Sequence, residues 1–110
     1  MPEPLIELVA QRFRVLGEPM RIKLLDRLRD SDATVGELQE APGVSQQNVS
    51  KHLGILRDAG MVSRVKRGNH TVYSISDPGV FELCEQVCGG VRRQLYELEL
   101  LVGDQRPVVS

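Results

Sequence analysis

Amide, hydroxyl and ammonium side chains cluster in one short stretch of the chain. They are Gln46, Gln47, Asn48, Ser50 and Lys51. Between and after them Val49, Leu53 and Leu56 recur at helical spacing, which predicts a helix with one apolar face and one polar face. Ser45 is a suitable N-cap, because its hydroxyl can accept a backbone N–H at the helix start. Gln and Asn can pair bidentately with adenine in the major groove, and Ser and Lys can reach base edges or phosphates. The polar face therefore suits readout of DNA rather than catalysis.

A basic hairpin is predicted directly after this helix. Gly60 is placed to end the helix as a C′ glycine, and two short strands, Met61–Lys66 and Thr71–Ile75, flank the turn Arg67–His70. The hairpin carries cations beside small or polar turn residues: Arg64, Lys66, Arg67, Gly68 and Asn69. Such a ribbon, placed next to a reading helix, is suited to contact phosphates or the minor groove.

The helix followed by a basic hairpin is the arrangement of a winged helix-turn-helix. Residues 44–75, VSQQNVSKHLGILRDAGMVSRVKRGNHTVYSI, resemble the ArsR/SmtB repressors, which are small dimeric bacterial regulators. The likeness extends more loosely from Phe13 to Val87, and the phrase Leu16–Ile22 resembles the family's start of the second helix. The resemblance implies a mainly α fold with a small β-hairpin wing (α+β), and a repressor that binds an operator in double-stranded DNA.

The two histidines both fall in this stretch. His52 follows Lys51 at a position where the family often has histidine, and a DNA contact is favoured there over a half-exposed polar residue. For His70, in the turn of the hairpin, a DNA contact and a half-exposed polar residue are about equally favoured.

Charge is unevenly distributed along the chain. The whole chain has a formal net charge of −1, but residues 45–75 carry five basic residues and one acidic residue, so they sum to +4 and the rest to −5. A local positive field is what release of counterions from DNA requires.

Three helices are expected before the polar helix. The first contains Leu5–Leu16. The second begins at Pro19, with four apolar positions and four solvated basic ones: Ile22, Leu24, Leu25, Leu28 and Arg21, Lys23, Arg27, Arg29. After a polar turn, Asp30–Ala33, Thr34 and Glu37 form a capping box for a third helix, Val35–Glu40, and Ala41–Val44 make the turn of the helix-turn-helix.

A long last helix follows the hairpin, with Ser76 or Asp77 as its cap and Pro78 in its first turn. It ends near Gly103, and its apolar residues follow an i, i+3, i+4 pattern: Val80, Leu83, Val87, Val91, Leu95, Leu98 and Leu101. This stripe, like that of the first helix, is longer than one small domain can cover. We therefore expect a homodimer whose recognition helices lie about one DNA turn apart.

The chain is expected to be one domain over residues 1–103 with a disordered tail over 104–110. With 110 residues and 41% hydrophobic content, it can build only a modest core. It has no apolar run long enough to span a membrane, and Met1–Pro4 has no basic region before an apolar one, so a cytoplasmic location is expected. No P-loop, GxGxxG, HExxH or nucleophile elbow is present, so an enzyme is not predicted.

Cys84 and Cys88 are spaced i, i+4, which places both thiols on one face of the last helix. Three interpretations stay open: small core residues, ligands of a thiophilic metal or metalloid ion, or redox sensors. The cysteine box and the Asp/His and His/Glu sets common in the family's metal sensors are missing here. Two thiolates are also few for a closed zinc site.

Two classes of function remain at this point. The leading one is a repressor that an effector releases from an inverted-repeat operator, and the inducer is left open. The alternative is a winged-helix module that binds protein or RNA. Within the first class, a repressor with no metal or redox sensor is a further alternative. Steep salt dependence and preference for an inverted repeat distinguish the first class from the second.

Overall fold

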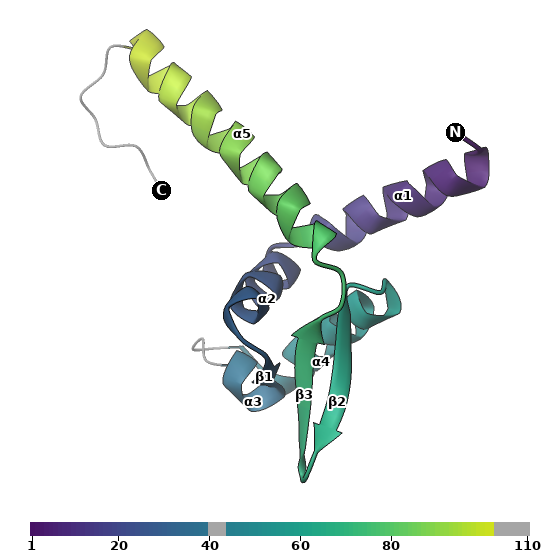
Figure 1. Cartoon of the computed structure of the whole chain (residues 1–110). Coiled ribbons are helices and arrows are strands. Elements are labelled where there is room, and N and C mark those ends of the chain that lie inside the picture. Colours follow the sequence, from purple (N-terminus) through teal and green to yellow (C-terminus); the bar gives the residue numbers. More distant parts are fainter. Residues whose placement is uncertain (40–43, 103–110) are drawn as a thin grey trace. The chain divides into compact units, whose positions relative to one another are not determined.

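The computed structural model describes residues 1–39 and 44–102 (Figure 1). The chain divides into two units, Met1–Pro78 and Gly79–Ser110. The first unit contains four helices and a three-stranded antiparallel sheet, and the second contains one helix. The elements in chain order are α1 (Glu3–Leu16), α2 (Pro19–Asp30), β1 (Ala33–Thr34), α3 (Val35–Leu38), α4 (Gln46–Asp58), β2 (Val62–Arg67), β3 (His70–Ile75) and α5 (Gly79–Val102). The predicted mainly α fold with a β-hairpin wing is confirmed.

The junction between α1 and α2 is built by Gly17, Glu18 and Pro19. Oε2 of Glu18 accepts the backbone N–H groups of Met20 at 2.8 Å and Arg21 at 3.2 Å, so Glu18 is the N-cap of α2. Pro19 occupies the first helical position, where a missing N–H costs nothing. The predicted start of the second helix is confirmed.

One face of α2 and one face of α4 contribute to the core of the first unit, together with Leu16, Ala33, Leu38, Met61, Val62 and Tyr73. Buried leucines of α2 are Leu24, Leu25 and Leu28, and none is more than 3% exposed. Ile22, predicted as a fourth apolar position, is instead 46% exposed. With 3.6 residues per turn, Ile22 lies roughly 110° around the helix from the centre of the three leucines, so it points away from this core.

Strand β1 was not expected, because Ala33 was assigned to a polar turn. Ala33 and Thr34 instead pair with Tyr73 and Val72, which gives a sheet in the order β1-β3-β2. Ala33 is only 1% exposed. Ala33 is therefore a buried residue of the sheet, and the polar turn is confined to the residues before it.

The predicted capping box of α3 is confirmed. Thr34 Oγ1 accepts the N–H of Glu37 at 3.2 Å, and Glu37 Oε1 accepts the N–H of Thr34 at 3.1 Å. The donated backbone N–H, followed by the Thr34 hydroxyl, lowers the pKa of Glu37. α3 ends at Leu38, whereas the prediction extended it to Glu40; Glu40 and the predicted turn residues 41–43 lie outside the described residues.

Both ends of α4 are set by its sequence. Ser45 Oγ accepts the N–H of Asn48 at 3.0 Å, so the predicted N-cap is confirmed. At the other end the N–H of Gly60 donates to Arg57 O at 2.9 Å and that of Met61 to Leu56 O at 3.0 Å, the two bonds of a Schellman motif. Gly60 has φ of 75°, a conformation that a side chain disfavours, which is why glycine occupies this position.

The wing is a regular hairpin of β2 and β3. Their register runs from Val62 opposite Ile75 to Arg67 opposite His70, so only Gly68 and Asn69 connect the strands. The expected four-residue turn is therefore too long. Gly68 has φ of 62° and Asn69 does not have a positive φ, which is the pattern of a type II′ turn.

The second unit is the helix α5. It begins at Gly79, so Pro78 precedes the helix and is not in its first turn as predicted. Large apolar side chains remain exposed along it: Val87, Val91, Leu95 and Leu98 are each at least 40% exposed. Among the described residues, no helix has the length and apolar character needed to cross a membrane. The predicted tail, residues 104–110, lies outside the described residues.

Candidate nucleic-acid interface

The polar and apolar residues of α4 lie on different sides of the helix. Val49, Leu53 and Leu56 have no exposed surface and form its inner face. The predicted reading residues are on the outside, with Asn48 half-buried and the remainder exposed: Ser45, Gln46, Gln47, Ser50 and Lys51. The predicted polar outer face of α4 is therefore present, and its contact with DNA stays a prediction.

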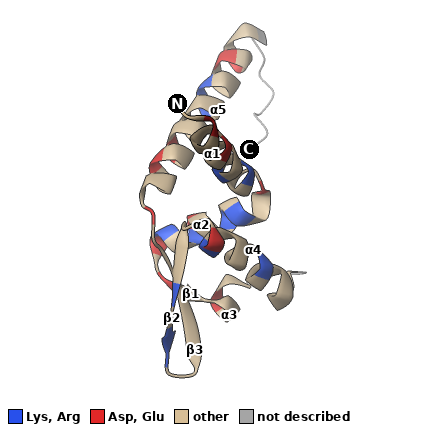
Figure 2. Cartoon of the chain, turned by 90° about the vertical axis from the view of Figure 1, so that its right-hand side faces the viewer, with Lys and Arg blue, Asp and Glu red and all other residues tan. Residues whose placement is uncertain are grey.

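The wing supplies the positive charge. All of its predicted contact residues are exposed: Arg64, Lys66, Arg67, Gly68, Asn69 and His70. Figure 2 shows Lys and Arg on β2 and on α4, both of which belong to the first unit. The two elements are joined by the short connection Ala59–Met61, so an exposed polar helix face and a cationic ribbon occur within one folded unit.

His52 is the exception among the predicted interface residues. It is 8% exposed, and its Nδ1 lies 3.1 Å from Nη1 of Arg21. A side chain held in this way faces the body of the protein, so the expectation of a half-exposed residue is wrong. The inward contact with Arg21 also disfavours the expected DNA contact, and His52 does not belong to the candidate interface.

Arg21 is the functional candidate that sequence reasoning missed. It was interpreted as a solvated cation, but it is half-buried and bonded to Val15 O and to His52. The signal was available in part, because Arg21 belongs to the phrase Leu16–Ile22 that resembles the family. Nothing in the sequence indicated that His52, 31 residues away, is the partner of Arg21.

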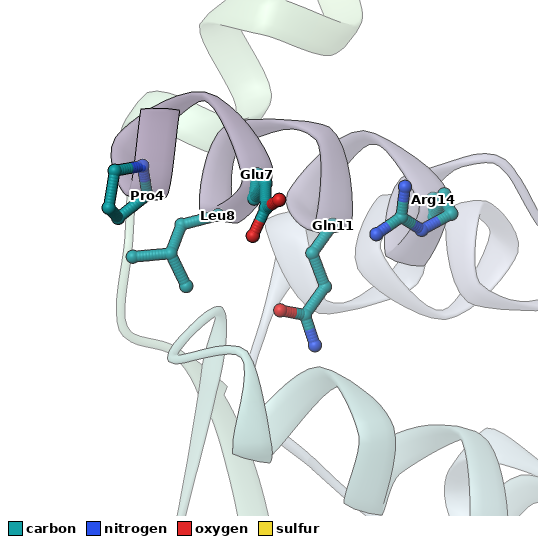
Figure 3. A pocket seen from close by; sticks show the side chains of 5 residues that line it. All are labelled: Pro4, Glu7, Leu8, Gln11 and Arg14. Carbon is teal, nitrogen blue, oxygen red and sulfur yellow. The ribbon is translucent and has the colours of Figure 1, made fainter. Parts of the chain in front are cut away.

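Two hollows of the first unit lie along α1. The larger, of about 590 Å³, is lined by Pro4, Glu7, Leu8, Gln11 and Arg14 (Figure 3). All five residues come from a single helix, so the hollow is a feature of its surface and not an enclosed site. A second hollow of about 340 Å³ lies between α1 and the end of α4, where Arg12 and Val15 meet Ile55 and Ala59.

The cysteines offer only part of a metal site. Cys84 is half-buried and Cys88 is exposed, and both are thiols. In the described part of this chain, no group of three or more His, Cys, Asp or Glu side chains is placed to hold a metal ion. Two thiols of one chain can ligate a thiophilic ion, but a closed site needs further ligands.

Known proteins share this architecture. A family model described as a helix-turn-helix domain matches residues 16–65. The HTH-type transcriptional regulator Rv0081 of Mycobacterium tuberculosis is 43% identical over 74% of this chain and 72% of its own length. The crystal structure of Rv0081 superposes with a TM-score of 0.79 at 38% identity, covering 87% of this chain and 97% of that chain.

Two further relatives have names that state repression. A probable mercury resistance operon repressor from Streptomyces lividans is 42% identical over 67% of this chain and 59% of its own length. The HTH-type transcriptional repressor SmtB of Mycobacterium tuberculosis is 36% identical over 69% of this chain and 56% of its own length. The chain belongs to the ArsR/SmtB family of winged helix-turn-helix transcriptional regulators.

Proposed function

We propose that the protein is a homodimeric repressor that reads an inverted-repeat operator with α4 and holds the DNA backbone with the wing, acting on DNA in the cytoplasm. The observation that carries this is the exposed polar face of α4 in the same unit as the cationic β2. Base contacts specify sequence, whereas cations on the backbone supply affinity and salt dependence.

Exposed apolar surface supports the dimer. α1 exposes Leu5, Ile6, Leu8 and Phe13, each at least 42% exposed, and α5 exposes a second stripe. A small protein rarely leaves contiguous apolar helix faces in water, and a second copy would bury both. Two-fold pairing would present two α4 helices to two half-sites about one DNA turn apart.

Gln47→Ala and Arg67→Ala should separate readout from attachment. Gln47→Ala should relax base preference at one operator position at a cost of about 1–3 kcal/mol, because a bidentate amide contact is lost. Arg67→Ala should weaken all duplexes alike and reduce the salt slope by about 1. Fluorescence anisotropy over a salt series, with single-base operator variants, measures both effects.

Lys23→Ala is the matched control, because Lys23 is an exposed cation on α2 and outside the proposed interface. Unchanged affinity and base preference in Gln47→Ala would show that the reading face is assigned incorrectly. A wild-type protein without salt dependence or preference for an inverted repeat would favour the module that binds protein or RNA.

We further propose that Cys84 and Cys88 receive a thiophilic ion that releases the repressor. The thiol of Cys88 is exposed in a single chain, so an ion can reach it there. The relative from Streptomyces lividans is named as a repressor of mercury resistance, which supports an ion of this class. Ligands missing from one chain would come from the partner of the proposed dimer.

Titration with arsenite, Cd²⁺, Zn²⁺, Cu⁺ or peroxide should identify the signal. If a thiophilic ion is the effector, it should lower operator affinity of the wild type by about 5- to 150-fold and leave the Cys84→Ser/Cys88→Ser protein unaffected. Peroxide alone acting through these thiols would indicate a redox sensor. A double variant that responds like the wild type would place the sensor elsewhere, and no response in either protein would leave a repressor without a metal or redox signal.

A further inference from the structure

Arg21 connects three segments of the first unit. Its Nε donates to Val15 O in the last turn of α1 at 2.6 Å, and its backbone N–H donates to Glu18 Oε2 at 3.2 Å. Its Nη1 lies 3.1 Å from Nδ1 of His52, which is in the middle of α4. One side chain thus bonds the end of α1 to the helix that carries the reading face.

The chemistry of the two groups fixes their roles. A guanidinium can only donate hydrogen bonds, so Nδ1 of His52 must be the acceptor and cannot carry a proton in this arrangement. This arrangement places the ring proton on Nε2. Glu18 Oε2 is 3.8 Å from the same Nδ1, which is longer than a hydrogen bond, and this oxygen already accepts two backbone N–H groups.

Directional contacts determine how a helix is oriented on a core. The buried residues Val49, Leu53 and Leu56 hold α4 against the unit, but apolar contact is non-directional. A hydrogen bond weakens steeply when its length or angle changes. Rotation of α4 about its axis would move Nδ1 of His52 away from the guanidinium of Arg21, whose Nε donates to Val15 O.

We propose that Arg21 is a positioning residue that sets the orientation of α4 relative to the α1–α2 junction, and so the aim of Gln46, Gln47 and Ser50 at DNA. This rests on the proposed function, in which α4 reads the operator. Because the bond begins at α1, it also ties a helix proposed to pair with a second copy to the helix that reads bases.

Operator affinity and salt dependence of four variants test the positioning role. Arg21→Met removes the charged hydrogen bond to His52 that is proposed to orient α4. Operator affinity should therefore fall about tenfold or more. Its salt slope should stay unchanged, since the Arg21 contacts face inward and not toward phosphate. Lys23→Met is the matched control, with the same charge change at an exposed position of α2, and should stay within about twofold of the wild type.

His52→Asn and His52→Leu test the acceptor. The amide oxygen of Asn can take the place of Nδ1, so His52→Asn should retain most of the affinity, whereas His52→Leu should lose as much as Arg21→Met. Long-range ¹H–¹⁵N correlation spectra of the histidine rings give a readout without DNA. His52 should show one tautomer with unprotonated Nδ1 in the wild type and a mixture in Arg21→Met, with the exposed His70 as internal reference.

Three results would overturn the positioning role. They are an Arg21→Met protein as active as Lys23→Met, equal loss in His52→Asn and His52→Leu, and a wild-type His52 that is protonated at Nδ1. If Arg21→Met does not fold, the two His52 variants and the wild-type spectrum still decide. A wild-type protein that binds no duplex would instead overturn the proposed function, and with it the reason for aiming α4.

Discussion

Leu98→Glu should convert the protein to a monomer and reduce operator affinity by at least about 100-fold. Leu98 is 51% exposed on the apolar stripe of α5, where a partner helix is proposed to cover it. Burying a carboxylate in that proposed dimer interface is strongly unfavourable. Two linked half-sites gain about 10²–10⁴ in avidity over one, and a monomer forfeits this gain. Leu95→Glu, one turn earlier on the same stripe, should behave alike.

Sedimentation velocity at micromolar protein concentration and operator titration at fixed salt measure the two effects. Gln86→Glu is the control, because it adds the same charge at an exposed polar position of α5, roughly 120° away from the stripe. A wild-type protein that sediments as a monomer and still binds its operator tightly would show that pairing through these helices is not required.

The features that the sequence predicted well depend on residues close together in the chain. The N-cap Ser45, the capping box of Thr34 and Glu37 and the C′ glycine Gly60 each act within one helical turn. Their chemistry is complete in a window of about six residues. The helices and hairpin therefore followed from local pattern, and so did the outward polar face of α4.

The features that were missed depend on contacts between residues far apart in the chain, or on a residue at the border between two faces of a helix. β1 exists because Ala33 and Thr34 meet β3 some 40 residues later, and two residues carry no periodicity of their own. His52 lies roughly 70° from the centre of the inner face of α4, at its border, where spacing alone decides nothing. The burial of His52 and its contact with Arg21, 31 residues away, show that this side chain faces inward.

Leu53→Ala should lower the free energy of unfolding by about 2–5 kcal/mol. Leu53 has no exposed surface and lies on the inner face of α4. Its truncation removes apolar contact and leaves a cavity that the short helices can close only in part. Since small domains are stable by about 5–15 kcal/mol in total, the loss is a large share of the stability that keeps α4 folded.

Urea unfolding at one fixed protein concentration measures the change, because the stability of a dimer depends on that concentration. Ile22→Ala is the matched control: it removes a similar side chain that the sequence also assigned to the apolar face of its helix, but Ile22 is 46% exposed. We expect the urea midpoint of Ile22→Ala to change far less than the urea midpoint of Leu53→Ala. Equal shifts of the urea midpoint would show that Ile22 is covered as completely as Leu53 in the dimer. The proposed dimer interface would then extend from α1 and α5 onto α2.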